Sequence, residues 1–122
     1  MLPKSKMVKK ALETLYNGIC TVTVHREYEK DNGATGFRDE VVIENEPCHL
    51  SISNKSATQG GQTSASVSQI TQLFIRPDVD IPSGSKITVT QNGRTTDYTR
   101  SGQPAVYDTH QEIVLELMDR WS

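Results

Sequence analysis

The sequence is 122 residues long, which suits a single domain and leaves little room for a second core. Hydrophobic residues make up only 34% of it, so the core is expected to be thin. With 13 basic and 15 acidic residues the formal net charge is −2, and no chain-wide positive field is present to hold a nucleic-acid backbone. We therefore expect one small domain, residues 1–122, that does not bind nucleic acid over its whole surface.

Residues 1–18 predict one α-helix. Pro3 suits a first helical turn, and Asn17 with Gly18 suits a C-terminal stop. The apolar residues at helical spacing are Met7, Val8, Ala11, Leu12 and Leu15. This segment is amphipathic and unlike a secretory signal, and no apolar run in the chain approaches a membrane span. We expect a protein made in the cytosol that does not contact membranes.

A period of two then predicts strands. A first strand is followed by a turn at residues 31–36 and by a second extended stretch at 37–43, so the two form a hairpin that ends near Pro47. A short third strand is expected directly after this proline. The alternating apolar residues are Cys20, Val22 and Val24 in the first strand and Cys48, Leu50 and Ile52 in the third.

The composition changes abruptly at Ser53. Of the 17 residues from Ser53 to Gln69, 13 are Ser, Thr, Gln, Asn or Gly, and Lys55 is the only charged residue. Such a segment buries too little apolar surface to offset about 1 to 2 kcal/mol of backbone entropy per residue. We expect residues 53–69 to form a long, flexible polar loop, and loops of this length in small domains are often functional.

The rest of the chain is predicted to be β-structure. Residues 73–75 form a strand that stops at Arg76, Asn92 with Gly93 marks a hairpin, and 110–118 form a final strand. Short strands separated by turns, after a single helix, indicate a mainly β fold. We expect a small antiparallel β-barrel, or a sandwich, with one N-terminal α-helix and a long flexible loop.

The residues with metal-binding or catalytic chemistry do not form a motif. Two cysteines and three histidines are too widely spaced for a local zinc site, so buried inert thiols and surface histidines are favoured. In the segment 108–112, His110 and Glu112 share a strand face, as a general base and its carboxylate would, but no nucleophile or phosphate-loop motif accompanies them. We expect no enzyme activity, no metal and no cofactor. The five thiol and imidazole residues are Cys20, Cys48, His25, His49 and His110.

A cluster of four lysines lies in the predicted helix and could contact an acidic partner or DNA. Cations near a helix N-terminus oppose the helix dipole, which weakly suggests a purpose other than helix stability. The alternative is an ordinary solvated helix face. The candidate partner-contact residues are Lys4, Lys6, Lys9 and Lys10.

A family resemblance rests on the second half of the chain. Residues 74–87, Tyr98 and residues 101–112, together with 47–51 followed by a polar loop, resemble the small minor capsid proteins of tailed bacteriophages and prophages. That group is similar to head-tail connector stopper proteins. The resemblance covers most of the chain, and its motifs are patterns of turns and strands.

The resemblance implies a β-barrel subunit that joins a ring under the portal and adaptor, closes the channel over packaged DNA and receives the tail. In that family a loop projecting into the channel closes it, and the matching position here is 53–69, with Gly60 and Gly61 at a flexible tip. The near-neutral charge of this segment favours steric closure over contact with phosphates. The candidate channel-closing residues are Lys55, Gln59, Gly60, Gly61 and Gln62.

The expected partners are portal, adaptor and tail proteins, with the chain a monomer when isolated and a homo-oligomeric ring in the virion. Packaged DNA would lie nearby without sequence-specific binding. The expected location is the head-tail connector of the virion, and the bacterial cytoplasm during assembly. The alternative is a small β-barrel module that binds a peptide or nucleic acid as a regulator; dispersed basic residues and only 6% aromatic residues argue against nucleic acid.

Overall fold

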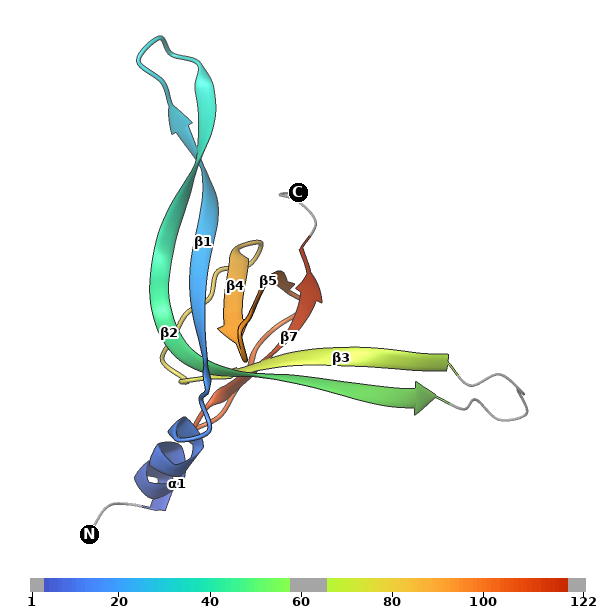
Figure 1. Ribbon diagram of the computed structural model, residues 1–122. Coiled ribbons are helices and arrows are strands. Elements are labelled where there is room, and N and C mark those ends of the chain that lie inside the picture. The colour runs from blue at the N-terminus through green and yellow to red at the C-terminus, as the bar shows by residue number, and fades with distance from the viewer. Residues whose placement is uncertain (1–3, 58–65, 119–122) are drawn as a thin grey trace.

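The computed structural model describes residues 4–57 and 66–118 and shows one short helix followed by seven antiparallel strands (Figure 1). The helix ends before the first strand, and the strands differ greatly in length, from 2 to 23 residues. The elements are α1 (Lys4–Glu13), β1 (Gly18–Glu29), β2 (Thr35–Ala57), β3 (Ser66–Ile75), β4 (Lys86–Gln91), β5 (Arg94–Arg100), β6 (Ala105–Val106) and β7 (Gln111–Leu117).

Six of the strands close into a ring. They are hydrogen-bonded in the order β3-β2-β1-β4-β5-β7, and β3 also pairs with β7, while the short β6 is added outside β7. Closure removes the free sheet edges within the ring, which is how small β-barrels avoid edge-to-edge association. The predicted mainly β fold with antiparallel strands and one N-terminal helix is confirmed.

The core lies inside this ring and is built by alternation along the strands. In β4, for example, Ile87 and Val89 are buried while Thr88 and Thr90 on the other face are half-exposed. The buried hydrophobic residues are Cys20, Val22, Cys48, Leu73, Ile75, Ile81, Ile87, Val89, Tyr98, Ile113 and Leu115. The core is therefore made mostly of aliphatic side chains.

β2 is one continuous strand that exchanges its partner near Pro47. It pairs with β1 up to Cys48 and with β3 from Cys48 onward. Two register shifts against β1 mark bulges beside this exchange, and Asn45 within them has a φ of 52°. The expectation of two separate strands on either side of Pro47 was wrong, because the bulges and the change of partner let a residue without an N–H group lie inside a strand.

Side-chain contacts fix the end of β3 beside this exchange point. The Arg76 Nη2 and Nε atoms each lie 2.6 Å from Glu46 Oε1, and this contact raises the pKa of Arg76. The turn that follows is held from β7, since Gln111 Nε2 donates to the carbonyl oxygens of Arg76 at 2.9 Å and Val79 at 2.5 Å. Gln111 is buried, so its amide serves the turn and is not part of a surface site.

Two hairpins continue beyond the ring as two-stranded arms (Figure 1). β1 pairs with β4 only up to Thr23, so residues 24–29 and their partners 35–40 form the β1–β2 arm. β3 pairs with β7 only from Thr71 onward, so residues 66–70 and their partners 53–57 form the β2–β3 arm. The arms point in different directions from the ring.

Two predicted boundaries need correction. The helix ends at Glu13, and the N–H groups of Thr14, Leu15 and Tyr16 then bond three residues back, because the last turn tightens. The polar segment 53–69 is not a loop throughout: 53–57 and 66–69 are paired strand residues, and 58–65 lie outside the described residues. Backbone hydrogen bonds between two polar strands replace the missing apolar burial.

Candidate functional site

The β2–β3 arm is the position of the predicted channel-closing residues. Its five residue pairs run from Ser53 with Ile70 to Ala57 with Ser66. At about 3.3 Å per residue, the arm extends roughly 15 Å past the ring. Lys55 lies in the arm opposite Ser68, while Gln59, Gly60, Gly61 and Gln62 are outside the described residues. The structure thus places Lys55 on a projecting ribbon. The prediction for the other four residues stays a prediction.

The arm has little means of binding an anion tightly. Lys55 is the only charged residue in 52–71, and the remaining residues are polar, small or aliphatic. Ile52, at the base of the arm, is exposed over 55% of its surface. A ribbon with one charge can fill space or pair with another strand along its edges, but it cannot neutralise several phosphates.

The four predicted partner-contact lysines all belong to α1. Lys10 is exposed, whereas the side chains of Lys4, Lys6 and Lys9 are not among those described. With Glu13 as the only acidic residue of the helix, α1 is strongly basic. The apolar positions Met7 and Val8 are also exposed, so the helix does not bury its whole apolar stripe against the barrel.

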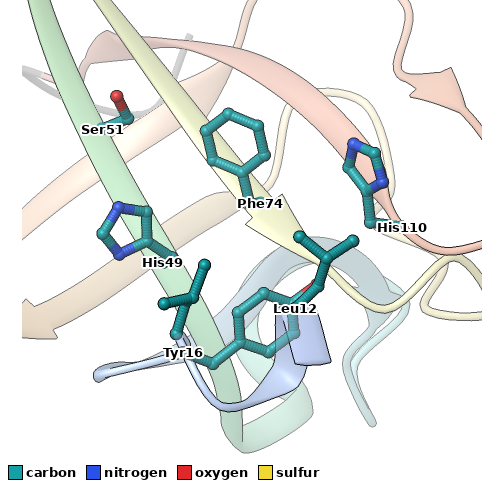
Figure 2. Close-up of a pocket in the computed structure, with 7 residues that line it drawn as sticks. Leu12, Tyr16, His49, Ser51, Phe74 and His110 are labelled. Carbon is teal, nitrogen blue, oxygen red and sulfur yellow. The ribbon is translucent and has the colours of Figure 1, made fainter. Parts of the chain in front are cut away.

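A pocket of about 300 Å³ lies between α1 and the barrel (Figure 2). The C-terminal half of the helix and the turn after it form one wall, and β2, β3 and the turn before β7 form the other. Phe74 lies in the middle, with its ring centroid 6.1 Å from that of His49 and 6.0 Å from that of His110. The lining residues are Leu12, Leu15, Tyr16, His49, Ser51, Phe74 and His110. We call this cavity the helix pocket.

The two histidines of the helix pocket are held in fixed orientations. His49 Nδ1 lies 2.9 Å from Asn17 Oδ1, and this contact sets the orientation of the ring. His110 Nε2 lies 2.9 Å from Glu112 Oε2, and its Nδ1 lies 2.9 Å from Thr109 Oγ1. Both rings are half-buried, so the expectation of surface histidines was wrong for this pair, while His25 is exposed.

The hydroxyl, imidazole and carboxylate of residues 109–112 form a chain of hydrogen bonds that could accept a proton. These groups also hold one turn together: the Tyr107 N–H donates to the His110 carbonyl at 2.8 Å, and the two rings stack at 5.1 Å. The contacts therefore serve to start β7. Sequence reasoning placed His110 and Glu112 on one face, and their hydrogen bond agrees with that placement.

The Tyr16 hydroxyl, in the wall of the helix pocket, lacks a hydrogen-bond partner among the described residues. It is also buried. Burial raises the pKa of Tyr16, and the nearby Glu13 carboxylate raises it further. The hydroxyl thus stays protonated and can donate to an incoming acceptor.

The cysteines occupy the core and not a site. Cys20 and Cys48 are free thiols with no exposed surface. The pKa of the Cys20 thiol is raised far above its usual range. The larger cause is a hydrogen bond with Cys48, and the next is burial. Within residues 4–57 and 66–118 no group of three His, Cys, Asp or Glu residues is placed to hold a metal ion.

Sequence reasoning missed the helix pocket. His49 was weighed as a metal ligand and His110 as a metal ligand or general base, yet these two residues meet Phe74 because β2, β3 and β7 are neighbours in the ring. Registers across these strands place His49 opposite Phe74 and Phe74 opposite Glu112. The sequence did contain one signal, since these aromatic and imidazole residues occupy outward-facing positions in or next to their strands. The pattern does not show which strands are neighbours, so it could not predict that the residues meet.

No family model matches the sequence, and no curated protein matches it. Among solved structures, the chain is similar to the phage-like element PBSX protein xkdH from Bacillus subtilis. The TM-score is 0.48 at 11% sequence identity, and the match covers 83% of this chain and 92% of that one. Among the described residues, no helix has the length and apolar character needed to cross a membrane.

Proposed function

We propose that this protein is a structural virion component of a tailed phage or prophage, a head-tail connector stopper. It docks under the portal and adaptor ring, closes the DNA channel and offers an attachment site to the tail. The sequence resemblance over residues 74–112 supports this role. The observation that carries it is the β2–β3 arm, a two-stranded ribbon with a single charged residue that leaves a closed barrel.

The arm supports closure by steric exclusion. Residues 53–57 and 66–70 form a pre-ordered stalk, so the segment between them starts away from the barrel surface. Ordering only the end of the stalk costs less entropy than ordering a 17-residue loop. With Lys55 as its one charge, the arm would block the channel without gripping the DNA that must later pass.

The role we propose is not enzymatic and uses no cofactor. The hydrogen bonds of His110, Thr109 and Glu112 hold a turn, and the thiols lie in the core. The partners are portal, adaptor and tail proteins, and packaged DNA lies nearby without being read. The protein would be found in the connector of the virion and, during assembly, in the bacterial cytoplasm.

Deletion of residues 58–65 tests closure. These residues lie beyond the paired strands, so the shortened chain should fold and still attach to heads. Purified heads would be assayed for bound subunit and for nuclease-protected genome. We expect the subunit to be present and the genome to be lost.

A length-matched control separates steric closure from specific contacts. Replacing residues 58–65 by eight glycine and serine residues should restore genome retention if the segment acts by filling space. Full retention of DNA by the deletion variant would contradict closure by this arm.

A second candidate is a small β-barrel module that binds a peptide as a regulator. The helix pocket favours it, because a concave site with apolar walls and two oriented imidazoles suits one anchoring side chain. Substituting Phe74 would abolish such a regulatory interaction, whereas DNA retention in heads would depend on the β2–β3 arm. The two candidates thus predict different sensitive residues.

A further inference from the structure

The β1–β2 arm has one acidic face with an aromatic ring at its centre. Cross-strand register places Phe37 opposite Glu27, and Asp39 opposite His25, so these side chains share a face. The Phe37 ring stacks on His25 at 5.0 Å and is still exposed over 60% of its surface. Glu29 follows Glu27 on the same face by the period of two.

The charges of this face are unbalanced. Arg26 and Arg38 lie on the opposite face, where Arg26 Nε pairs with Glu40 Oε2 at 2.8 Å and Arg38 lies over Tyr28. On the Phe37 face Asp39 contacts His25, while Glu27 and Glu29 form no ion pair with any described side chain. The face therefore presents an aromatic anchor surrounded by carboxylates.

The helix end of the molecule has the complementary character. α1 carries four lysines against one glutamate, and it forms a wall of the helix pocket. Leu15 in that wall is exposed over 62% of its surface. At about 300 Å³ the pocket is at the small end of ligand sites, so it suits a single ring better than a larger molecule.

One chain cannot satisfy both surfaces by itself. Figure 1 shows α1 at one end of the molecule and the tip of the β1–β2 arm at the other, with the barrel between them. A contact between two different surfaces of identical chains is head-to-tail, and such contacts produce rings when the rotation closes. The complementary charges and the size of the pocket thus point to a second copy as the occupant.

We propose that the Phe37 face of the β1–β2 arm docks into the helix pocket of a neighbouring copy, with Phe37 as the anchor and with Glu27 and Glu29 attracted by the net positive charge of α1. This inference rests on the proposed function, which supplies the ring of subunits. It adds the interface between neighbouring subunits. A single anchor with solvent-exposed ion pairs gives a weak contact, which agrees with a chain that is a monomer until a pre-assembled portal aligns many copies.

Photocrosslinking of the full chain tests the contact. Phe37 is replaced by the photoreactive benzoylphenylalanine, and isotopically light and heavy proteins are mixed at about 1 mM, so that a millimolar contact is populated. We expect crosslinks between copies that join position 37 to residues lining the helix pocket, which fragment sequencing locates within 12–16 or in the peptides that contain His49, Phe74 and His110. Val106, exposed over 62% of its surface against 60% for Phe37, carries the probe in the control and should not label these residues.

Two sets of variants test the chemistry of the contact. Leu15→Glu, at an exposed position, should lower the crosslink about tenfold with an unchanged circular dichroism spectrum. The double variant Glu27→Lys, Glu29→Lys should lower the crosslink yield and remove the dependence of that yield on salt concentration. Glu44→Lys with Asp80→Lys changes the net charge equally at other exposed positions and should have little effect.

The outcomes separate the contact from the proposed function. A probe at position 37 that labels no second copy, or labels it away from the residues that line the helix pocket, overturns the contact. In purified heads, labelling of a different protein from position 37 would also overturn it. If the protein is present in heads but gives no such crosslink, the proposed function stands and the contact is wrong. If it gives the crosslink but is absent from heads, the contact stands and the proposed function is wrong.

Discussion

The side-chain amide of Gln91 completes the hydrogen bonding of β2 at Leu50. The Leu50 N–H donates to Gln91 Oε1 at 2.8 Å, and Gln91 Nε2 donates to the Leu50 carbonyl at 2.9 Å. β1 begins at Gly18, opposite Cys48, so Leu50 has no strand neighbour on that side. The amide of Gln91, at the end of β4, takes the place of a strand residue where β2 extends past the start of β1.

Gln91→Ala should lower the free energy of unfolding by about 1 to 3 kcal/mol, because it leaves a part-buried N–H and a carbonyl of β2 without partners. Chemical denaturation with an unchanged slope would measure this loss. Gln103→Ala, at an exposed loop position, is the control and should change stability by less than about 0.5 kcal/mol. Equal stability of the two variants would show that the pairing of Gln91 with Leu50 contributes nothing.

Gly18→Ala should act through the same contact. A Cβ atom at Gly18 would lie 2.8 Å from Gln91 Oε1, so the amide would have to move and give up Leu50. In a double-mutant cycle, Gly18→Ala should therefore lower the free energy of unfolding by less in the Gln91→Ala background than in the wild type. Strictly additive effects would assign the cost of the glycine substitution to the backbone atoms nearby and not to Gln91.

Both thiols should be inert in the folded protein. Cys20 and Cys48 are fully buried, and the raised pKa of Cys20 keeps it protonated, so a disulfide reagent at pH 8 should modify neither until the chain is unfolded. Because the folded state holds this proton more tightly, stability should be constant below the ordinary thiol pKa of about 8.5 and fall as pH rises above it. Rapid labelling of the native protein would contradict the buried pair.

Amide hydrogen exchange should divide the molecule into a ring and two arms. Amides of 53–57 and 66–70 belong to a two-stranded ribbon without an apolar face, and such ribbons are marginal by themselves. They should exchange faster than those of β4, which lies between two partners, by about tenfold or more. Equal protection in both regions would mean that the β2–β3 arm opens only when the whole protein unfolds.

The isolated chain should sediment as a monomer at micromolar concentration. The proposed contact between copies has one anchoring ring and exposed charges, which is much less than the surface of a stable oligomer. Sedimentation velocity over a range of concentrations is the measurement. A stable hexamer or dodecamer of the free chain would contradict assembly on a pre-formed portal ring.

The predictions that held concern interactions between near neighbours in the chain. Asn92 and Gly93, with φ values of 53° and 75°, make the hairpin between β4 and β5 because both tolerate the left-handed conformation. Cys20 and Val22 were expected on the core face, and they are buried because alternation depends only on the strand geometry. Arg76 with Pro77 ends β3 as expected, since proline offers no N–H to continue the ladder.

The composition of residues 53–69 by itself predicted little apolar burial, whereas the structure of the described part of this segment depended on pairing. Once Cys48 to Ile52 of β2 lie beside β3, the polar strands continue the same register past the ring. Pro47 was interpreted as a break because proline has no N–H group to donate to a neighbouring strand. The tertiary structure decided otherwise, since the bulges opposite β1 and the exchange of partner place it where its missing N–H costs little.

The sequence alone determined the fold class, the hairpins and the basic character of α1, because these depend on local periodicity, turn chemistry and composition. Only the tertiary structure decided the ring closure between β3 and β7, the meeting of His49, Phe74 and His110, and the pairing of Gln91 with Leu50 across 41 residues. These contacts join strands distant in the chain, and alternation shows which face a side chain occupies without showing which strand lies beside it.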